Sequence, residues 1–94
     1  MTYTVEEAKE ILQCDPDYPD SKVKDMLESA DAELLKATGI DYAKNPTPLS
    51  KKYVRMYILQ EYNNSTEYHK EFDFTQGMSS LLVKLTYGGR SNGR

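Results

Sequence analysis

Apolar residues recur at helical spacing along most of this chain, and the spacing predicts a series of α-helices. Thr4 and Glu7 bracket the first of them in the pattern of a capping box, in which each side chain bonds the other residue's backbone amide. This helix is expected to end near Gln13 or Cys14. Its apolar side consists of Val5, Ala8, Ile11 and Leu12.

A second helix is expected from about Lys22 to Thr38, after a loop at residues 15–20 that is rich in aspartate and proline. Asp20 or Ser21 is predicted to cap its start, and Gly39 to end it in the left-handed conformation. The apolar stripe of this helix consists of Val23, Met26, Leu27, Ala30, Leu34 and Ala37. The opposite side is predicted to be a solvated acidic face made of Asp25, Glu28, Asp31 and Glu33.

The third predicted helix, from Pro48 to about Asn63 with Thr47 as its cap, is apolar on nearly every side. A helix of that kind is buried on several sides. We expect the other helices to be too few to cover it, so that neighbouring copies or a docking platform do so. Its apolar residues are Leu49, Tyr53, Val54, Met56, Tyr57, Ile58, Leu59 and Tyr62, and its polar patch is Lys51, Lys52 and Arg55.

A last helix is expected to begin at the cap Thr75 and to stop at Tyr87-Gly88-Gly89. Its apolar residues are Met78, Leu81, Leu82 and Leu85. The pattern at residues 67–74 suits either a loop or one extra helical turn. The sequence therefore predicts an all-α fold, a compact single-domain bundle of four helices or five, with residues 1–88 as the helical domain and 89–94 as a flexible tail.

Length and cysteine content favour self-association. A chain of 94 residues buries a limited share of its surface, and one cysteine, Cys14, allows no internal disulfide. The N-terminal stretch has neither the charge nor the apolar run of a signal peptide, and no stretch approaches a membrane span, so a soluble cytoplasmic protein is expected. The net charge of −3 argues against a general nucleic-acid binder.

Tyrosine dominates the aromatic residues: eight of the ten aromatic side chains are tyrosines. Tyrosine combines an apolar ring with a polar hydroxyl and is enriched at protein interfaces. The alternative, equally open for any single ring, is that it fills the small core and reaches water with its hydroxyl. The residues predicted to contact partners are Tyr42, Tyr53, Tyr57, Tyr62, Arg90 and Arg94.

The sequence offers no catalytic or metal-binding constellation. Asp15, Asp17 and Asp20 invite comparison with a calcium loop, but the glycine and glutamate that an EF-hand requires are missing at the matching positions. Cys14 has only His69 as a candidate activating base, without the third group of a triad. We expect no enzyme activity, no cofactor and no metal.

The order of these features resembles that of phage head–tail connector proteins, also called adaptor or head-completion proteins. The stretch VEEAKEILQCDPDYPDSKVKDMLESADAELLKATG is similar to the opening of that family, with its short helix, aspartate-rich loop and longer helix closing in Ala-Thr-Gly. PLSKKYVRMYILQEYNN resembles the central helix, and GMSSLLVKLTYG the last one. The likeness covers about residues 4–88. It departs after Tyr62, where many members have an Asn-Arg-Glu type segment and this chain has Asn-Asn-Ser-Thr.

The resemblance implies a non-catalytic subunit of a homo-oligomeric ring, twelvefold in the virion. Such a ring sits on the portal protein, extends the DNA channel and presents a surface to the next connector or tail-completion protein. DNA passes through without specific binding. The implied location is the host cytoplasm during assembly and then the virion head–tail junction. Asp25, Glu28 and Asp31 are our candidates for a channel-facing acidic surface, and the third helix and loop 41–47 for subunit contacts.

A second interpretation is a small helical regulator that binds nucleic acid or another protein. Lys51, Lys52 and Arg55 share one helical face near a helix start, where three cations could meet phosphates. A solvated face on a half-buried helix explains the same residues. Salt-dependent DNA binding would separate this interpretation from the connector.

Overall fold

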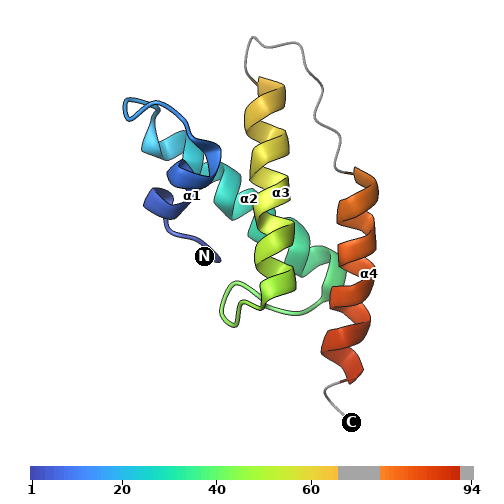
Figure 1. Ribbon diagram of the computed structural model, residues 1–94. Coiled ribbons are helices and arrows are strands. Elements are labelled where there is room, and N and C mark those ends of the chain that lie inside the picture. Colours follow the sequence, from blue (N-terminus) through green and yellow to red (C-terminus); the bar gives the residue numbers. More distant parts are fainter. Residues whose placement is uncertain (66–74, 92–94) are drawn as a thin grey trace.

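The computed structural model describes residues 1–65 and 75–91, and these residues form four α-helices and no strand (Figure 1). The helices are α1 (Val5–Leu12), α2 (Asp20–Thr38), α3 (Pro48–Ser65) and α4 (Thr75–Ser91). The all-α fold class predicted from the sequence is confirmed. The possible extra turn at 67–74 lies outside the described residues.

Helix α3 is the central element of the bundle. It contacts α1, α2 and α4, while α2 crosses behind it and also contacts α1 and α4 (Figure 1). Helix α4 runs antiparallel to α3 along its other side. The two helices approach closely at Gly77, where an added Cβ atom would lie 2.9 Å from the Cε atom of Met56. The chain therefore surrounds α3 with its own helices.

One hydrophobic core joins all four helices. Buried apolar side chains come from each helix and from one loop residue, Tyr42. Because every helix contributes, no helix can leave without exposing part of the same cluster. The buried apolar residues are Ala8, Leu12, Val23, Leu27, Ala30, Leu34, Tyr42, Tyr53, Val54, Ile58, Leu81 and Leu85.

Local sequence signals explain the start and end of α1. The Glu7 amide donates to the Thr4 hydroxyl at 3.1 Å, and the Thr4 amide donates to the Glu7 carboxylate at 2.9 Å. The predicted capping box is thus confirmed. Gln13 ends the helix in the left-handed conformation, with φ of 52°.

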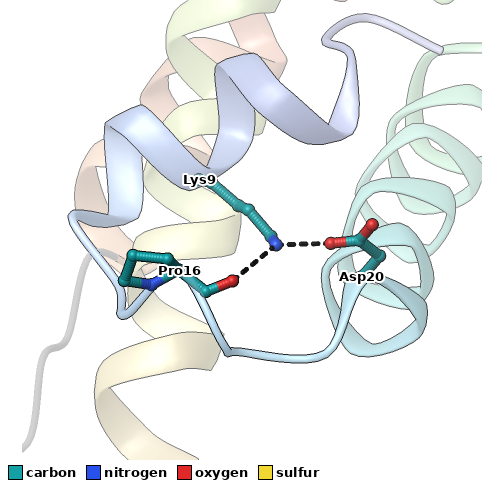
Figure 2. A network of polar contacts seen from close by, with 3 residues as sticks. All are labelled: Lys9, Pro16 and Asp20. Atoms are coloured by element: carbon teal, nitrogen blue, oxygen red, sulfur yellow. Dashed lines mark hydrogen bonds and ion pairs between the residues drawn. The ribbon is translucent and has the colours of Figure 1, made fainter.

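Helix α2 does not begin with the predicted side-chain cap. Its N-cap residue is Pro19, which makes no capping hydrogen bond, and Asp20 is the first helical residue. The Asp20 carboxylate instead forms an ion pair with Lys9 of α1, and the same ammonium donates to the Pro16 carbonyl at 3.5 Å (Figure 2). The hydrogen bond to Asp20 is the main cause that raises the pKa of Lys9. The carboxylate therefore ties α1 to α2 instead of capping α2.

The end of α2 confirms one prediction and corrects another. Gly39 closes the helix with φ of 73°, as expected for a left-handed C-cap. Thr38 is buried: its hydroxyl donates to the Leu34 carbonyl at 2.8 Å and accepts from the Ile40 amide at 3.1 Å. Ala37, predicted in the apolar stripe, is exposed. Thr38 takes its place because these two hydrogen bonds satisfy its buried hydroxyl.

Helix α3 begins at Pro48 as predicted. Thr47 and Ser50 form a reciprocal pair, in which each backbone amide donates to the other side chain's hydroxyl, at 2.7 and 3.1 Å. The helix ends at Ser65, two residues beyond the expected end.

Helix α4 continues to Ser91, so the predicted stop at Tyr87-Gly88-Gly89 is wrong. A glycine inside a helix costs about 1 kcal/mol relative to alanine, but it ends the helix only when it adopts a left-handed conformation. The predicted start of a tail at residue 89 therefore falls inside α4. Residues 92–94 lie outside the described part of the chain.

Candidate interaction surface

Helices α1, α2 and α4 cover much of the apolar surface of α3. Tyr53, Val54 and Ile58 are buried, and Met56, Tyr57, Leu59 and Tyr62 are half-buried against the same core. All three helices contact α3. That neighbouring copies or a docking platform cover the remainder stays a prediction. Only Leu49, in its first turn, is an exposed large apolar side chain among the described positions of α3, at 41%.

Two tyrosines predicted to contact partners belong to the core. Tyr42 is 7% exposed and its hydroxyl donates to the backbone carbonyl of Leu85 at 2.6 Å. Tyr53 is 4% exposed. Neither ring can reach another molecule unless the core opens. Their predicted interface role is therefore corrected: Tyr42 anchors loop 41–47 to α4, and Tyr53 fills the space between helices.

The other two predicted tyrosines, Tyr57 and Tyr62, are half-buried. The ring of Tyr62 meets that of Tyr18 edge to face, with 5.3 Å between the ring centroids. That contact ties the end of α3 to the loop before α2. Tyr57 lies at the surface between α2 and α3, so it is the predicted tyrosine with a ring edge left for a partner.

A shallow depression of about 210 Å³ surrounds Tyr57. Its lining consists of Asp25, Met26 and Ser29 from α2 and of Tyr57 and Glu61 from α3. Both carboxylates are exposed, and no basic side chain lines the depression. Burial raises the pKa of the Tyr57 hydroxyl, and the nearby charges of Glu61 and Glu33 raise it further. The depression therefore combines apolar side chains with two carboxylates in its lining.

The three residues predicted to form one acidic face differ in exposure, since Asp25 and Glu28 are exposed on α2 and Asp31 is half-buried. Asp31 is half-buried and accepts from the backbone amide of Thr2 at 3.1 Å and from its hydroxyl at 2.5 Å. Glu28 is exposed and lies 4.0 Å from the ammonium of Lys24. Asp25 belongs to the depression beside Tyr57. Asp31 therefore holds the N-terminal segment in place. The prediction that it belongs to a solvated face is wrong.

The exposed apolar surface lies on α4. Val83 is 56% exposed and Tyr87 is 66% exposed, the two highest values among the large apolar side chains described. They are four residues apart and therefore share one helical face, opposite the buried Leu81 and Leu85. Lys84, three residues before Tyr87, is exposed beside them. We call Val83, Lys84 and Tyr87 the α4 stripe.

The sequence analysis did not predict the α4 stripe, because it stopped the last helix at Tyr87 and so left that residue outside the helical face that includes Val83. A usable signal was present: Val83 and Tyr87 lie outside the stripe formed by Met78, Leu81 and Leu85. Large apolar residues at helical spacing on the polar side of an amphipathic helix indicate a second contact surface. Of the two arginines predicted to contact partners, Arg90 lies within α4 and Arg94 lies outside the described residues.

The basic patch of α3 is exposed but partly compensated. Lys51, Lys52 and Arg55 are all exposed. The Tyr3 hydroxyl donates to the Lys51 carbonyl at 3.1 Å, which holds the N-terminal segment beside the patch. The pKa of Glu7 is lowered, first by the hydrogen bond from the Thr4 amide and also by the nearby charge of Lys51. Glu7 therefore offsets part of the positive charge.

Charge is distributed unevenly between the two halves of the chain. Residues 1–39 carry ten acidic and four basic side chains, a net charge of −6, whereas residues 40–94 carry five acidic and eight basic ones, a net charge of +3. Within α4 the charged residues are Lys84 and Arg90, and neither is acidic. Two copies that meet head to tail can therefore bring opposite charges together.

The residues considered for catalysis and metal binding do not assemble into a site. Cys14 is half-buried, and His69 lies outside the described residues. Within residues 1–65 and 75–91, no group of three or more metal-ligating side chains comes together. Among the described helices, none has the length and apolar character needed to cross a membrane.

Comparisons of the chain with protein-family models, with curated proteins and with solved structures found no match. The candidate interaction surfaces are therefore assigned from this chain's own geometry. They are the Tyr57 depression, the α4 stripe and the basic patch of α3.

Proposed function

We propose that this protein is a structural subunit of the head–tail junction of a tailed phage or prophage. Copies of the chain form a ring on the portal, extend the DNA channel and join the head to the tail. The resemblance in the order and spacing of sequence features over residues 4–88 supports this proposal. So does the arrangement of four helices in the order that the resemblance implies.

The observation that carries the proposal is the exposed apolar face of α4. A small helical bundle that has buried its central helix still presents Val83 and Tyr87 on the outside of its last helix. Exposed apolar side chains grouped on one face mark a protein–protein contact. On α3, Tyr57 and Tyr62 are half-buried and Leu49 is exposed, so this helix adds less exposed apolar surface than was expected.

Mixing the protein with a purified portal ring from the same source tests the proposal. Size-exclusion chromatography with light scattering should show the protein eluting with the portal at a fixed stoichiometry. Replacing both Val83 and Tyr87 with serine should abolish coelution, because copies that lose the exposed apolar face of α4 cannot join into a ring on the portal. Leu35→Ser serves as the control, since Leu35 is also exposed, at 44%, but lies on α2. A wild-type protein that elutes separately from the portal at every ratio contradicts the proposal.

The second candidate is a regulator that binds nucleic acid through Lys51, Lys52 and Arg55. The exposure of all three side chains favours it, and the neighbouring Glu7 weakens it. Binding to duplex DNA should then fall steeply with salt, because each neutralised phosphate releases a counterion. Lys52→Glu should reduce the salt dependence. The connector proposal predicts no DNA binding that responds to this substitution.

A further inference from the structure

We propose that copies of this chain bind one another head to tail, with the α4 stripe of one copy seated in the Tyr57 depression of the next. This inference rests on the proposed function, because both require copies of the chain to associate. It adds the two surfaces that meet and the direction of the contact. A contact between two different surfaces can propagate into a ring or a filament, whereas a contact of one surface with itself stops at a dimer.

The two surfaces match in chemistry. The stripe presents an aliphatic side chain, an ammonium and an aromatic ring, at Val83, Lys84 and Tyr87, and all three are exposed. The lining of the depression combines Met26 and Tyr57 with the carboxylates of Asp25 and Glu61. Tyr87 can therefore bury its exposed ring against apolar atoms while the Lys84 ammonium meets a carboxylate.

The charge pattern selects the orientation. The lining of the depression holds two carboxylates, Asp25 and Glu61, and no basic side chain, whereas the charged residues of α4 are all basic. Two α4 stripes facing each other would bring like charges together, because α4 contains Lys84 and Arg90 and no acidic residue. Opposite charges favour the heterologous contact and oppose the symmetric one.

The contact must form between copies. Leu81 and Leu85 hold α4 against the core by the face opposite Val83 and Tyr87. The stripe therefore points away from its own bundle and cannot turn toward its own Tyr57 without losing those buried contacts. A second copy supplies the missing partner for both surfaces.

Two half-site variants test the direction of binding. The first, Asp25→Lys with Glu61→Lys, disables the depression, and the second, Tyr87→Ser with Lys84→Glu, disables the stripe. Asp25, Glu61, Lys84 and Tyr87 are exposed, so the substitutions leave the core intact. Matched controls carry the same change in net charge at exposed positions elsewhere: Glu10→Lys with Glu28→Lys for the first variant, and Leu35→Ser with Lys36→Glu for the second.

Sedimentation in reducing buffer, with this chain alone, measures the outcome. The wild type and both controls should show a mass that rises with concentration. Each half-site variant should stay monomeric, with its association weakened by at least about tenfold. An equimolar mixture of the two variants should form a dimer and nothing larger, because one intact stripe meets one intact depression.

Three results would overturn the inference: a wild type that remains monomeric at all concentrations, a half-site variant that associates like its control, or a mixture that stays monomeric. The proposed function fails separately. A chain that associates through these surfaces but ignores the portal removes the connector and leaves this inference intact. A chain that stays monomeric but binds the portal contradicts this inference and leaves the proposed function intact.

Discussion

Helices α3 and α4 lie side by side, yet they distribute their apolar residues in opposite ways. Helix α3 is apolar on nearly every side, and all but one of those residues are buried or half-buried against the core. Helix α4 is an ordinary amphipathic helix, and it displays Val83 and Tyr87 on its outer face. The difference arises from position, because α3 contacts three other helices whereas α4 contacts two, α2 and α3. Apolar content along a helix therefore does not indicate where exposed apolar surface will be.

Truncating one aliphatic side chain on each helix should give the largest difference in the free energy of unfolding. Ile58→Ala on α3 should lower the free energy of unfolding by about 2 to 5 kcal/mol, because it leaves a cavity in a fully buried site. Val83→Ala on α4 should change it by about 0.5 kcal/mol or less, since that side chain is mostly exposed. Urea unfolding monitored by circular dichroism measures both. Equal losses in the two variants would remove the distinction between the helices.

The attachment of α4 to the loop before α3 can be tested at Tyr42. Tyr42→Phe should cost about 1 kcal/mol, because the Leu85 carbonyl loses its buried hydroxyl donor. Tyr3→Phe is the matched control: its hydroxyl also donates to a backbone carbonyl, that of Lys51, but in an exposed setting. The control should lose less stability in the same urea titration. A larger loss for Tyr3→Phe would contradict the burial assigned to Tyr42.

Alkaline titration probes the burial of the α3 tyrosines. Burial raises the pKa of the Tyr53 hydroxyl above its ordinary value of 10.0, and burial has the same direction of effect at Tyr57 and Tyr62. The folded state holds these protons more tightly than the unfolded chain does. This stabilises the fold fully below the unfolded pKa of 10.0, and the stabilisation is lost as the pH rises through the higher pKa of the folded state. The free energy of unfolding should therefore fall above about pH 10. Tyr53→Phe should make the fall shallower, and an unchanged slope would contradict the assignment.

The smallest effect is expected where α1 meets α2. Lys9→Met removes the ion pair with Asp20 and the hydrogen bond to the Pro16 carbonyl, both near the surface (Figure 2). The urea midpoint should drop slightly in low salt, and the difference from wild type should shrink in high salt because salt screens exposed charges. Lys24→Met, which removes a 4.0 Å pair with Glu28, should have less effect.

Short-range sequence signals predicted local structure well. The Thr4–Glu7 capping box, the left-handed Gly39 and the proline start of α3 all depend on residues within one helical turn. The side of α2 that is buried was also largely predicted, since Val23, Leu27, Ala30 and Leu34 are all buried. The exception is the last turn, where Thr38 replaces Ala37 because of hydrogen bonds that the periodicity does not reveal.

Long-range consequences were harder to predict. Burial of Tyr42 depends on a loop folding against α4, more than forty positions later in the chain, and nothing near Tyr42 signals it. Asp31 leaves the predicted acidic face because Thr2 folds back on it. The cover of α3 depends on how three helices cross it, which a helical pattern alone does not specify. The candidate interface therefore includes α4 in addition to the part of α3 around Tyr57.

The most direct test of self-contained cover over α3 is urea unfolding at concentrations where the protein sediments as a monomer. If the chain covers its own central helix, the monomer should unfold cooperatively, with a midpoint that does not change on further dilution. A monomer that lacks cooperative unfolding, and folds only at concentrations where copies associate, would show that partners supply the cover and would contradict this account.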